Sequence, residues 1–153
     1  MSLAEQRLKE LGLDLPPVQA PVANYVRAVR TGNLVYLAGH LPVENGQIAY
    51  RGKLGHDMDV ETGYRAARVV MLNCLASLKD AIGDLDRVKR VVKLLGMVNS
   101  APDFTGQPQV MNGASDLLVA VFGDRGRHAR SAVGMAGLPS GVSVEIEMIV
   151  EVE

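Results

Sequence analysis

Charged side chains that could do chemistry gather in the last quarter of the chain. Arg130 begins an apolar stretch, and three glutamates, Glu145, Glu147 and Glu151, stand near the C-terminus. A guanidinium can hold a carboxylate through two parallel hydrogen bonds, and a positioned carboxylate can relay protons. An arginine and a glutamate that meet at a sheet surface could therefore form an active site, or only a solvated salt bridge.

The pattern around these residues predicts a β-hairpin. We expect one strand to begin at Arg130, the chain to reverse at residues 137–141, and a second strand to run to the C-terminus. Because side chains alternate along a strand, one face of the second strand is apolar and the other is acidic. Periodicity does not choose among the three glutamates. The apolar face holds Val142, Val144, Ile146, Met148, Val150 and Val152, and the other holds Ser143, Ile149 and the glutamates.

The composition indicates one globular domain and excludes several classes of protein. Of the 153 residues, 48% are apolar and 22% are charged, which is typical of a folded globular chain. The net charge of -1 argues against a general nucleic-acid binder. The single Cys74 excludes an internal disulfide and fits a core position better than a nucleophile, and the three histidines show no metal-ligand spacing. With no secretory signal and no apolar stretch of membrane-spanning length, we expect a cytoplasmic protein without metal, cofactor or membrane partner.

Local signals divide the chain into a short extension and one domain. Ser2 can cap a helix that ends near Gly12, and two prolines then interrupt regular structure. We therefore expect a helical extension over residues 1–18 and a single domain over residues 19–153.

The domain combines two helices with several strands. Amphipathic patterns predict one helix from Asp59 to Gly83 and another from Val110 to Gly123. Residues 25–38 predict an early hairpin. A later strand, at residues 86–97, is apolar on both faces, which indicates that its second face meets another subunit. This order predicts an α+β fold in which two helices pack on one face of a mixed sheet.

Two motifs carry a resemblance to a known family. In ARSAVGMAGLPSGVSVEIE, residues 129–147, an arginine precedes a Leu-Pro turn and an apolar-Glu-apolar triplet centred on Glu145. In NYVRAVRTGNLVYLAGHLPV, residues 24–43, an early hairpin ends in a small-Gly-polar-apolar-Pro run. Both motifs resemble the Rid/YjgF family of reactive-intermediate imine deaminases, also known by the older label endoribonuclease L-PSP.

The resemblance implies a fold, an assembly and an activity. The family has a chorismate-mutase-like fold and forms a homotrimer, in which the sheets line a central barrel and ligand clefts lie at the subunit interfaces. Its members hydrolyse reactive enamine or imine acids, such as 2-aminoacrylate, to 2-oxo acids and ammonia without metal or organic cofactor. Carried over to this chain, Arg130 clamps the substrate carboxylate and Glu145 positions the attacking water, while Tyr25, Gly39 and Asn112 match substrate-binding positions in the cleft.

Three departures from the family pattern leave the substrate open. His128 replaces a proline and Ala132 replaces a cysteine of the enamine-hydrolysing branch, and Ala23-Asn24 replaces its Gly-Pro. A non-catalytic protein that binds a small carboxylic acid therefore remains an alternative. An endoribonuclease or translation inhibitor, suggested by the older label, is a weaker alternative because the chain has almost no net charge.

Overall fold

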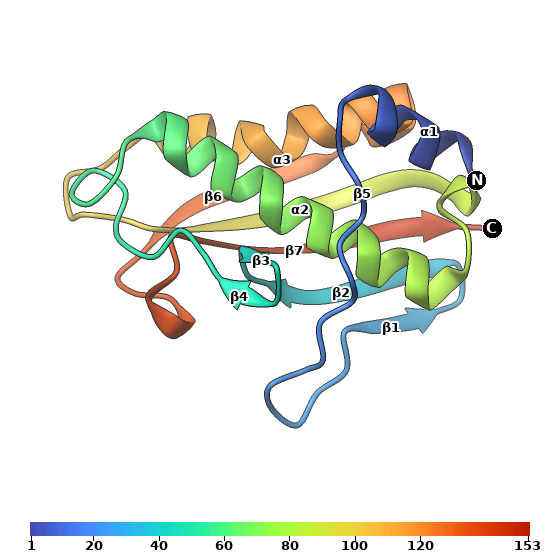
Figure 1. The fold of residues 1–153 in the computed structure, drawn as a ribbon, viewed down its shortest axis with the longest axis horizontal. Helices are drawn as coiled ribbons and strands as arrows, with labels where there is room; N and C mark the ends of the chain where they lie inside the picture. Colours follow the sequence, from blue (N-terminus) through green and yellow to red (C-terminus); the bar gives the residue numbers. More distant parts are fainter.

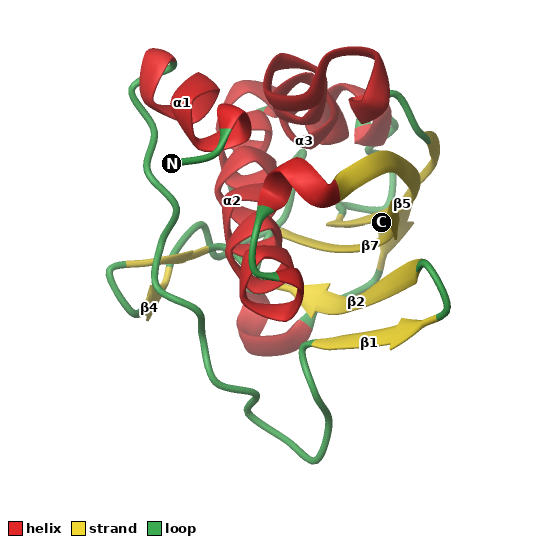
Figure 2. Ribbon diagram, turned by 90° about the vertical axis from the view of Figure 1, so that its right-hand side faces the viewer, coloured by secondary structure: helices red, strands yellow, loops and turns green.

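Helices cover one face of a five-stranded mixed sheet in the computed structural model, which describes residues 1–153 (Figures 1 and 2). The strand order in the sheet is β1-β2-β7-β5-β6, and β3 and β4 form a separate two-stranded hairpin. The strands are β1 (Ala28–Thr31), β2 (Leu34–His40), β3 (Val43–Glu44), β4 (Gln47–Ile48), β5 (Val88–Asn99), β6 (Ala129–Met135) and β7 (Val144–Val152). The helices are α1 (Leu3–Glu10), α2 (Val60–Ile82) and α3 (Gln107–Phe122), with short 3-10 turns η1 (Leu85–Arg87), η2 (Gly123–Gly126) and η3 (Pro139–Gly141).

Helix α2 begins and ends where its capping residues predict, whereas α3 ends at the predicted glycine but begins at Gln107, three residues before the expected Val110. Asp59 caps α2 by accepting a hydrogen bond from the Thr62 amide, and Gly83 ends the helix with a φ of 87°. Gly123 ends α3 in the same left-handed region, with a φ of 63°. Both glycines adopt a conformation that other residues rarely tolerate. The expected α+β fold, with these helices on one face of a mixed sheet, is confirmed.

The predicted C-terminal hairpin is wrong. Strand β6 does not pair with β7: it runs parallel to β5, with Arg130 opposite Leu94, and β5 in turn pairs antiparallel with β7. Strands β5 and β6 are parallel neighbours joined through α3, which is the usual crossover geometry. Strand β5, apolar on both faces, takes the inner position, whereas the short and partly exposed β6 forms the sheet edge. Periodicity identified both strands but could not reveal that a third strand separates them.

Helix α1 packs against the domain. Ser2 and Glu5 form a capping box, and the Asp86 carboxylate accepts hydrogen bonds from the amides of Leu3 and Ala4 at 2.8 and 3.1 Å. The side chains of Ala4 and Leu8 are buried within the main hydrophobic cluster. The predicted helix at this end is therefore confirmed, and its apolar side completes the core.

The far face of the sheet carries no helix (Figure 2). On that face Val29 pairs with Tyr36, and Tyr36 pairs with Ile149 on β7. Val29, Tyr36 and Val133 are exposed, so the bare face offers apolar surface to water. None of the helices is both long and apolar enough to cross a membrane.

Candidate functional site

Arg130 reaches from the edge strand to the first turns of α3. Its Nη1 donates to the Asn112 side-chain oxygen at 3.0 Å and to the Ser115 hydroxyl at 3.1 Å, and its Nη2 donates to the Pro108 carbonyl at 3.3 Å. The structure thus brings together two of the residues selected from the sequence, Arg130 and Asn112. Neutral partners hold the guanidinium and no carboxylate neutralises it, so its charge remains available to an anion.

His128 and Ser115 support Arg130, and the sequence did not assign them this role. The His128 Nδ1 donates to the Gly126 carbonyl at 2.7 Å, so Nε2 accepts the Ser115 hydroxyl proton across 2.9 Å. Ser115 then accepts from Arg130 with its oxygen. Burial, aided by the Arg130 charge, lowers the pKa of His128 and favours the neutral ring that this chain of hydrogen bonds requires. The only sequence signal was the histidine in place of the family's proline.

The structure separates the three glutamates that periodicity left equivalent. Glu151 lies 3.9 Å from Lys89 in an ion pair, and Glu147 is exposed. Glu145 is half-buried and forms none of the four ion pairs of the chain. Burial raises the pKa of Glu145, and the neighbouring Glu147 raises it further. A carboxyl group with a raised pKa can exchange a proton more readily near neutral pH.

A β-bulge in β2 places Gly39 against Glu145. The register between β2 and β7 shifts between Leu37 and His40, and such a shift turns the following side chains to the opposite faces of a sheet. His40 therefore points to the buried helix side. A Cβ added to Gly39 would overlap the Glu145 carboxylate. The absence of a side chain at position 39 gives Glu145 its place on the bare face.

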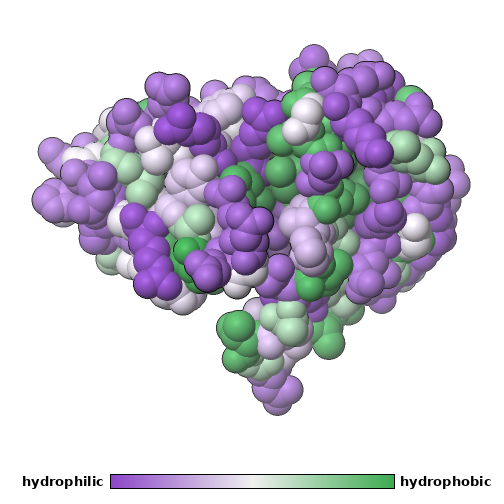
Figure 3. Space-filling view, in the orientation of Figure 1, coloured by the Kyte–Doolittle hydropathy of each residue, from purple (hydrophilic) through white to green (hydrophobic).

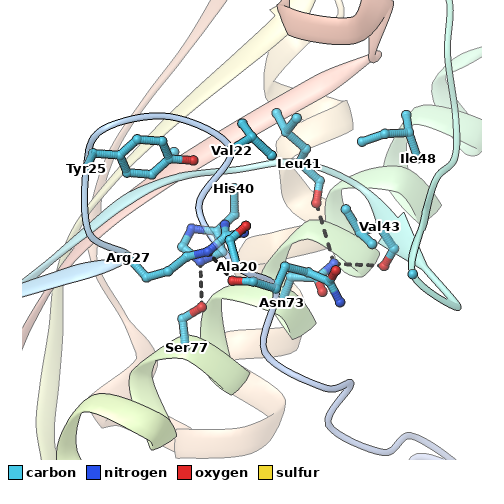
Figure 4. Close-up of a pocket in the computed structure, with 13 residues that line it drawn as sticks. Ala20, Val22, Tyr25, Arg27, His40, Leu41, Val43, Ile48, Asn73 and Ser77 are labelled. Carbon is cyan, nitrogen blue, oxygen red and sulfur yellow. Dashed lines mark hydrogen bonds between the residues drawn. The ribbon is translucent and has the colours of Figure 1, made fainter.

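Tyr25 lies on the loop that precedes β1. This loop projects from the body of the molecule, and Figure 3 shows apolar residues along the projection, with a hydrophilic residue at its tip. Val22 is 90% exposed and Tyr25 is 40% exposed. Tyr25 and Gly39 both line a cavity beside the end of β2 (Figure 4). The site residues selected from the sequence thus fall into two groups, Arg130 with Asn112 and Glu145 with Gly39, and Tyr25 shares the cavity with Gly39.

The two groups do not meet within one protomer. Arg130 pairs with the buried Leu94 and points to the helix side, whereas Glu145 pairs with Met97 and points to the bare side. Strand β5 lies between them. The sequence pattern did not predict this separation, because a hairpin would have made the two strands direct neighbours.

The side chains do not suggest a metal centre or a reactive thiol. No group of three or more histidine, cysteine, aspartate or glutamate side chains could hold a metal ion. Cys74 is fully buried on α2, and its Sγ lies 3.8 Å from the Ile146 carbonyl. Burial raises the pKa of this thiol far above its usual range, so Cys74 is a core residue.

The layered fold is that of a class of α+β proteins, those of YjgF/chorismate-mutase-like type. The family model described as "YjgF/chorismate_mutase-like, putative endoribonuclease" matches residues 5–149, and the chain belongs to this family. The family and the fold expected from the two sequence motifs are confirmed.

Several relatives share most of the chain. Protein TCP17 of Trypanosoma cruzi is 48% identical over 145 residues, which cover 94% of this chain and 91% of that protein. The crystal structure of protein Atu1372 of Agrobacterium tumefaciens, whose function is unknown, is 51% identical with a TM-score of 0.94, over 99% of this chain and 93% of that one. RidA from an Antarctic Psychrobacter is 30% identical with a TM-score of 0.62, over 88% of this chain and 94% of that one. The fold is thus shared closely with the first structure and more loosely with RidA.

Proposed function

We propose that this protein hydrolyses small enamine or imine acids, of the 2-aminoacrylate type, to 2-oxo acids and ammonia. The observation that carries the proposal is the Arg130–Asn112 pair, which presents a guanidinium without a carboxylate partner. A planar guanidinium matches a carboxylate in a way that an ammonium group does not. Membership of a family that includes RidA supports the same reaction.

In this mechanism Arg130 binds the substrate carboxylate and Glu145 manages the protons. The enamine takes up a solvent proton at its terminal carbon and loses one from its nitrogen, which makes it an imine. Glu145 then accepts a proton from a water molecule as that water attacks the imine carbon. Glu145 passes this proton to the nitrogen, which gives a carbinolamine. The hydroxyl proton of the carbinolamine then moves to the nitrogen, the C–N bond breaks, and ammonia leaves with the electron pair while the carbon becomes a carbonyl. The raised pKa of Glu145 suits a group that takes up and returns a proton.

We propose that the working site is shared between two protomers of a homotrimer. Arg130 and Glu145 point to opposite faces of one sheet, so one copy cannot place both against the same small molecule. The bare sheet face, with exposed Val29, Tyr36 and Val133, supplies apolar surface that a second copy can cover. Light scattering tests the assembly, because a mass near that of the 16.4 kDa monomer would contradict it.

The test of the activity is turnover of 2-aminoacrylate generated in place by a separate enzyme. Ammonia and pyruvate should appear faster with the protein than without it, and Arg130→Ala and Glu145→Gln should each remove most of the acceleration. Arg127→Ala and Glu151→Gln are the matched controls, because Arg127 is exposed and Glu151 lies six residues beyond Glu145 on β7, in an ion pair with Lys89. No acceleration, or equal activity in all four variants, would contradict the proposal.

One observation favours a binding protein that lacks this activity. Ala132 stands two residues beyond Arg130 on the same side of β6 and packs against the core, so it offers no polar group to a bound ligand. A thermal-shift screen of small carboxylic acids separates the two functions. Ligands that raise the melting temperature through Arg130, in a protein that turns over no enamine, would identify a binder.

A further inference from the structure

A cavity of about 200 Å³ lies on the helix side of the sheet, behind the end of β2 (Figure 4). It is enclosed by α2, by β2 and the residues after it, and by the N-terminal segment at residues 19–25. This volume could hold roughly six water molecules. The Glu145 carboxylate lies on the other face of the sheet, although the cavity shares Tyr25 and Gly39 with the residues expected in the proposed cleft.

Asn73 places an unsatisfied acceptor in the wall of this cavity. Its Nδ2 is surrounded by the carbonyls of Leu41, Val43 and Val69, at 3.4, 3.0 and 3.1 Å. Turning the amide over would set its oxygen against three carbonyl oxygens, so the orientation is fixed. Asn73 is only 4% exposed, and its Oδ1 has no hydrogen-bond partner. A buried acceptor of this kind calls for a donor from a bound molecule or from water.

Ser77 supplies a second acceptor one helical turn further along α2. The His40 Nδ1 donates to the Ala38 carbonyl at 2.6 Å, so the ring accepts the Ser77 hydroxyl proton at Nε2, 2.7 Å away. The lone pairs of Ser77 Oγ remain free. Asn73 and Ser77 lie four residues apart and therefore share one face of the helix. Both side chains can therefore accept a hydrogen bond from a hydroxyl or N–H group of a molecule bound in the cavity.

Arg27 is the only charged side chain among the residues that line the cavity. Its Nε and Nη2 donate to the carbonyls of Gln19 and Ala20, which ties the N-terminal segment over the opening. The hydrogen bonds of Arg27 leave Nη1 unused. Burial, with a smaller effect of Arg27, lowers the pKa of His40, as expected of a site that disfavours cations. The remaining wall includes the apolar Val22, Leu41 and Ile48, with Gln19 and Tyr25 as further polar side chains.

We propose that this cavity is a second small-molecule site, which binds a small monocarboxylate with an apolar body and a hydroxyl or N–H donor. The carboxylate contacts Arg27, the donor contacts Asn73 Oδ1 or Ser77 Oγ, and the apolar body lies against the aliphatic wall. The site is complete within one protomer and does not use Arg130.

The test is calorimetric titration of the full-length Arg130→Ala protein, which lacks the proposed substrate clamp. The probe is 2-hydroxyisovalerate, with isovalerate and 2-hydroxyisovaleramide as matched compounds that lack the hydroxyl and the charge. We expect one site per chain, and about tenfold weaker binding of each matched compound, as the loss of one charged or buried hydrogen bond implies. Arg27→Gln should weaken binding of 2-hydroxyisovalerate by about as much as replacing its carboxylate with the uncharged amide does.

Ile48→Phe provides a second variant that leaves the polar contacts in place and fills the cavity. It should abolish binding while preserving the fold, as judged by circular dichroism and melting temperature. Absence of saturable binding to Arg130→Ala at millimolar probe, which would indicate a cavity filled only by water, overturns the proposal. Unchanged binding in both Ile48→Phe and Arg27→Gln also overturns it. Turnover of 2-aminoacrylate by the wild-type protein is measured separately, so failure of the proposed activity is distinguishable from failure of this site.

Discussion

Arg130 and Glu145 lie on opposite faces of one sheet, with strand β5 between them. Arg130 is held on the helix side by Asn112 and Ser115, and Glu145 is held on the bare side above Gly39. Each residue is supported by its own neighbours, so neither needs the other in order to be placed. A site that uses both must therefore be assembled from two copies of the chain.

Mixed oligomers test this arrangement directly. If each site takes Arg130 from one protomer and Glu145 from another, Arg130→Ala and Glu145→Gln chains should complement one another when co-expressed. In random mixtures of a cyclic oligomer, about one quarter of the sites would combine an intact arginine with an intact glutamate. Deamination of 2-aminoacrylate by separately purified and by co-expressed variants is the measurement. Activity that stays absent in the mixture, although mixed oligomers form, would contradict a shared site.

A side chain at position 39 should displace the Glu145 carboxylate. In Gly39→Ala the new Cβ would overlap that carboxylate, which must move or change rotamer. We expect the turnover number to fall at least about tenfold, because a misplaced proton-transfer group loses most of its contribution, with little change in melting temperature. Gly137→Ala is the matched control, since an added Cβ there meets nothing within 4 Å. Equal loss of activity in both variants would show that the effect is not specific to Glu145.

The sequence predicted both ends of α2 because they depend on interactions with nearby residues in the chain. Asp59 and Gly83 act on the backbone within a few residues of themselves, so no knowledge of distant partners is needed. Strand pairing is different. The apolar alternation of β7 fits a partner on either side equally well, and only the parallel β5–α3–β6 crossover decides which strand β7 meets. The predicted hairpin failed for this reason.

Parts of the candidate site also depend on contacts between distant segments. The choice of Glu145 over Glu147 came from resemblance to a family, and the burial that distinguishes it depends on the β2–β7 register. Ser115 and His128 meet only because α3 packs beside β6. In the sequence, Asn73 is one more residue of an amphipathic helix. Its role as an acceptor in the cavity depends on the carbonyls after β2, which fix the orientation of its amide.

Ser115 and His128 should act as positioning residues for Arg130. Ser115→Ala removes one of the hydrogen bonds to the guanidinium and leaves His128 Nε2 without its donor. Under the proposed function we expect KM for the enamine acid to rise about tenfold, with a small change in kcat, since a weakened clamp affects binding more than proton transfer. A kcat that falls while KM is unchanged would argue against this role.

The pH dependence of KM separates positioning from a general structural effect. Protonated His128 cannot accept the Ser115 proton, so acid should loosen the clamp and raise KM in the wild-type protein. Because the pKa of His128 is lowered in the fold, this rise should begin only below the usual histidine value of about 6.5. His128→Gln cannot take up a proton here and should show a flatter profile. If the pH profile of KM in His128→Gln is identical to that of the wild type, His128 does not cause this pH dependence.

Stability should decline in mild acid because of buried His40. Its folded-state pKa lies below the ordinary value of 6.5, so between the two values the unfolded chain binds a proton that the folded chain does not. The free energy of unfolding therefore holds above about pH 6.5 and falls as the pH drops below it. His40→Gln should reduce this slope in melting temperature, and His56→Gln, at an exposed side chain, is the control. His128, whose pKa is lowered in the same direction, should account for part of the remaining slope.

Helix α1 should contribute measurably to stability. Leu8 is 1% exposed in the main core, whereas Leu3 on the same helix is 47% exposed. Leu8→Ala removes buried methyl groups and leaves a cavity, which costs roughly 2–4 kcal/mol of unfolding free energy in well-packed cores. Leu3→Ala should change the unfolding free energy by less than about 0.5 kcal/mol, as exposed substitutions usually do. Urea unfolding of both variants measures the difference, and equal stability of the two would show that α1 does not add to the core in solution.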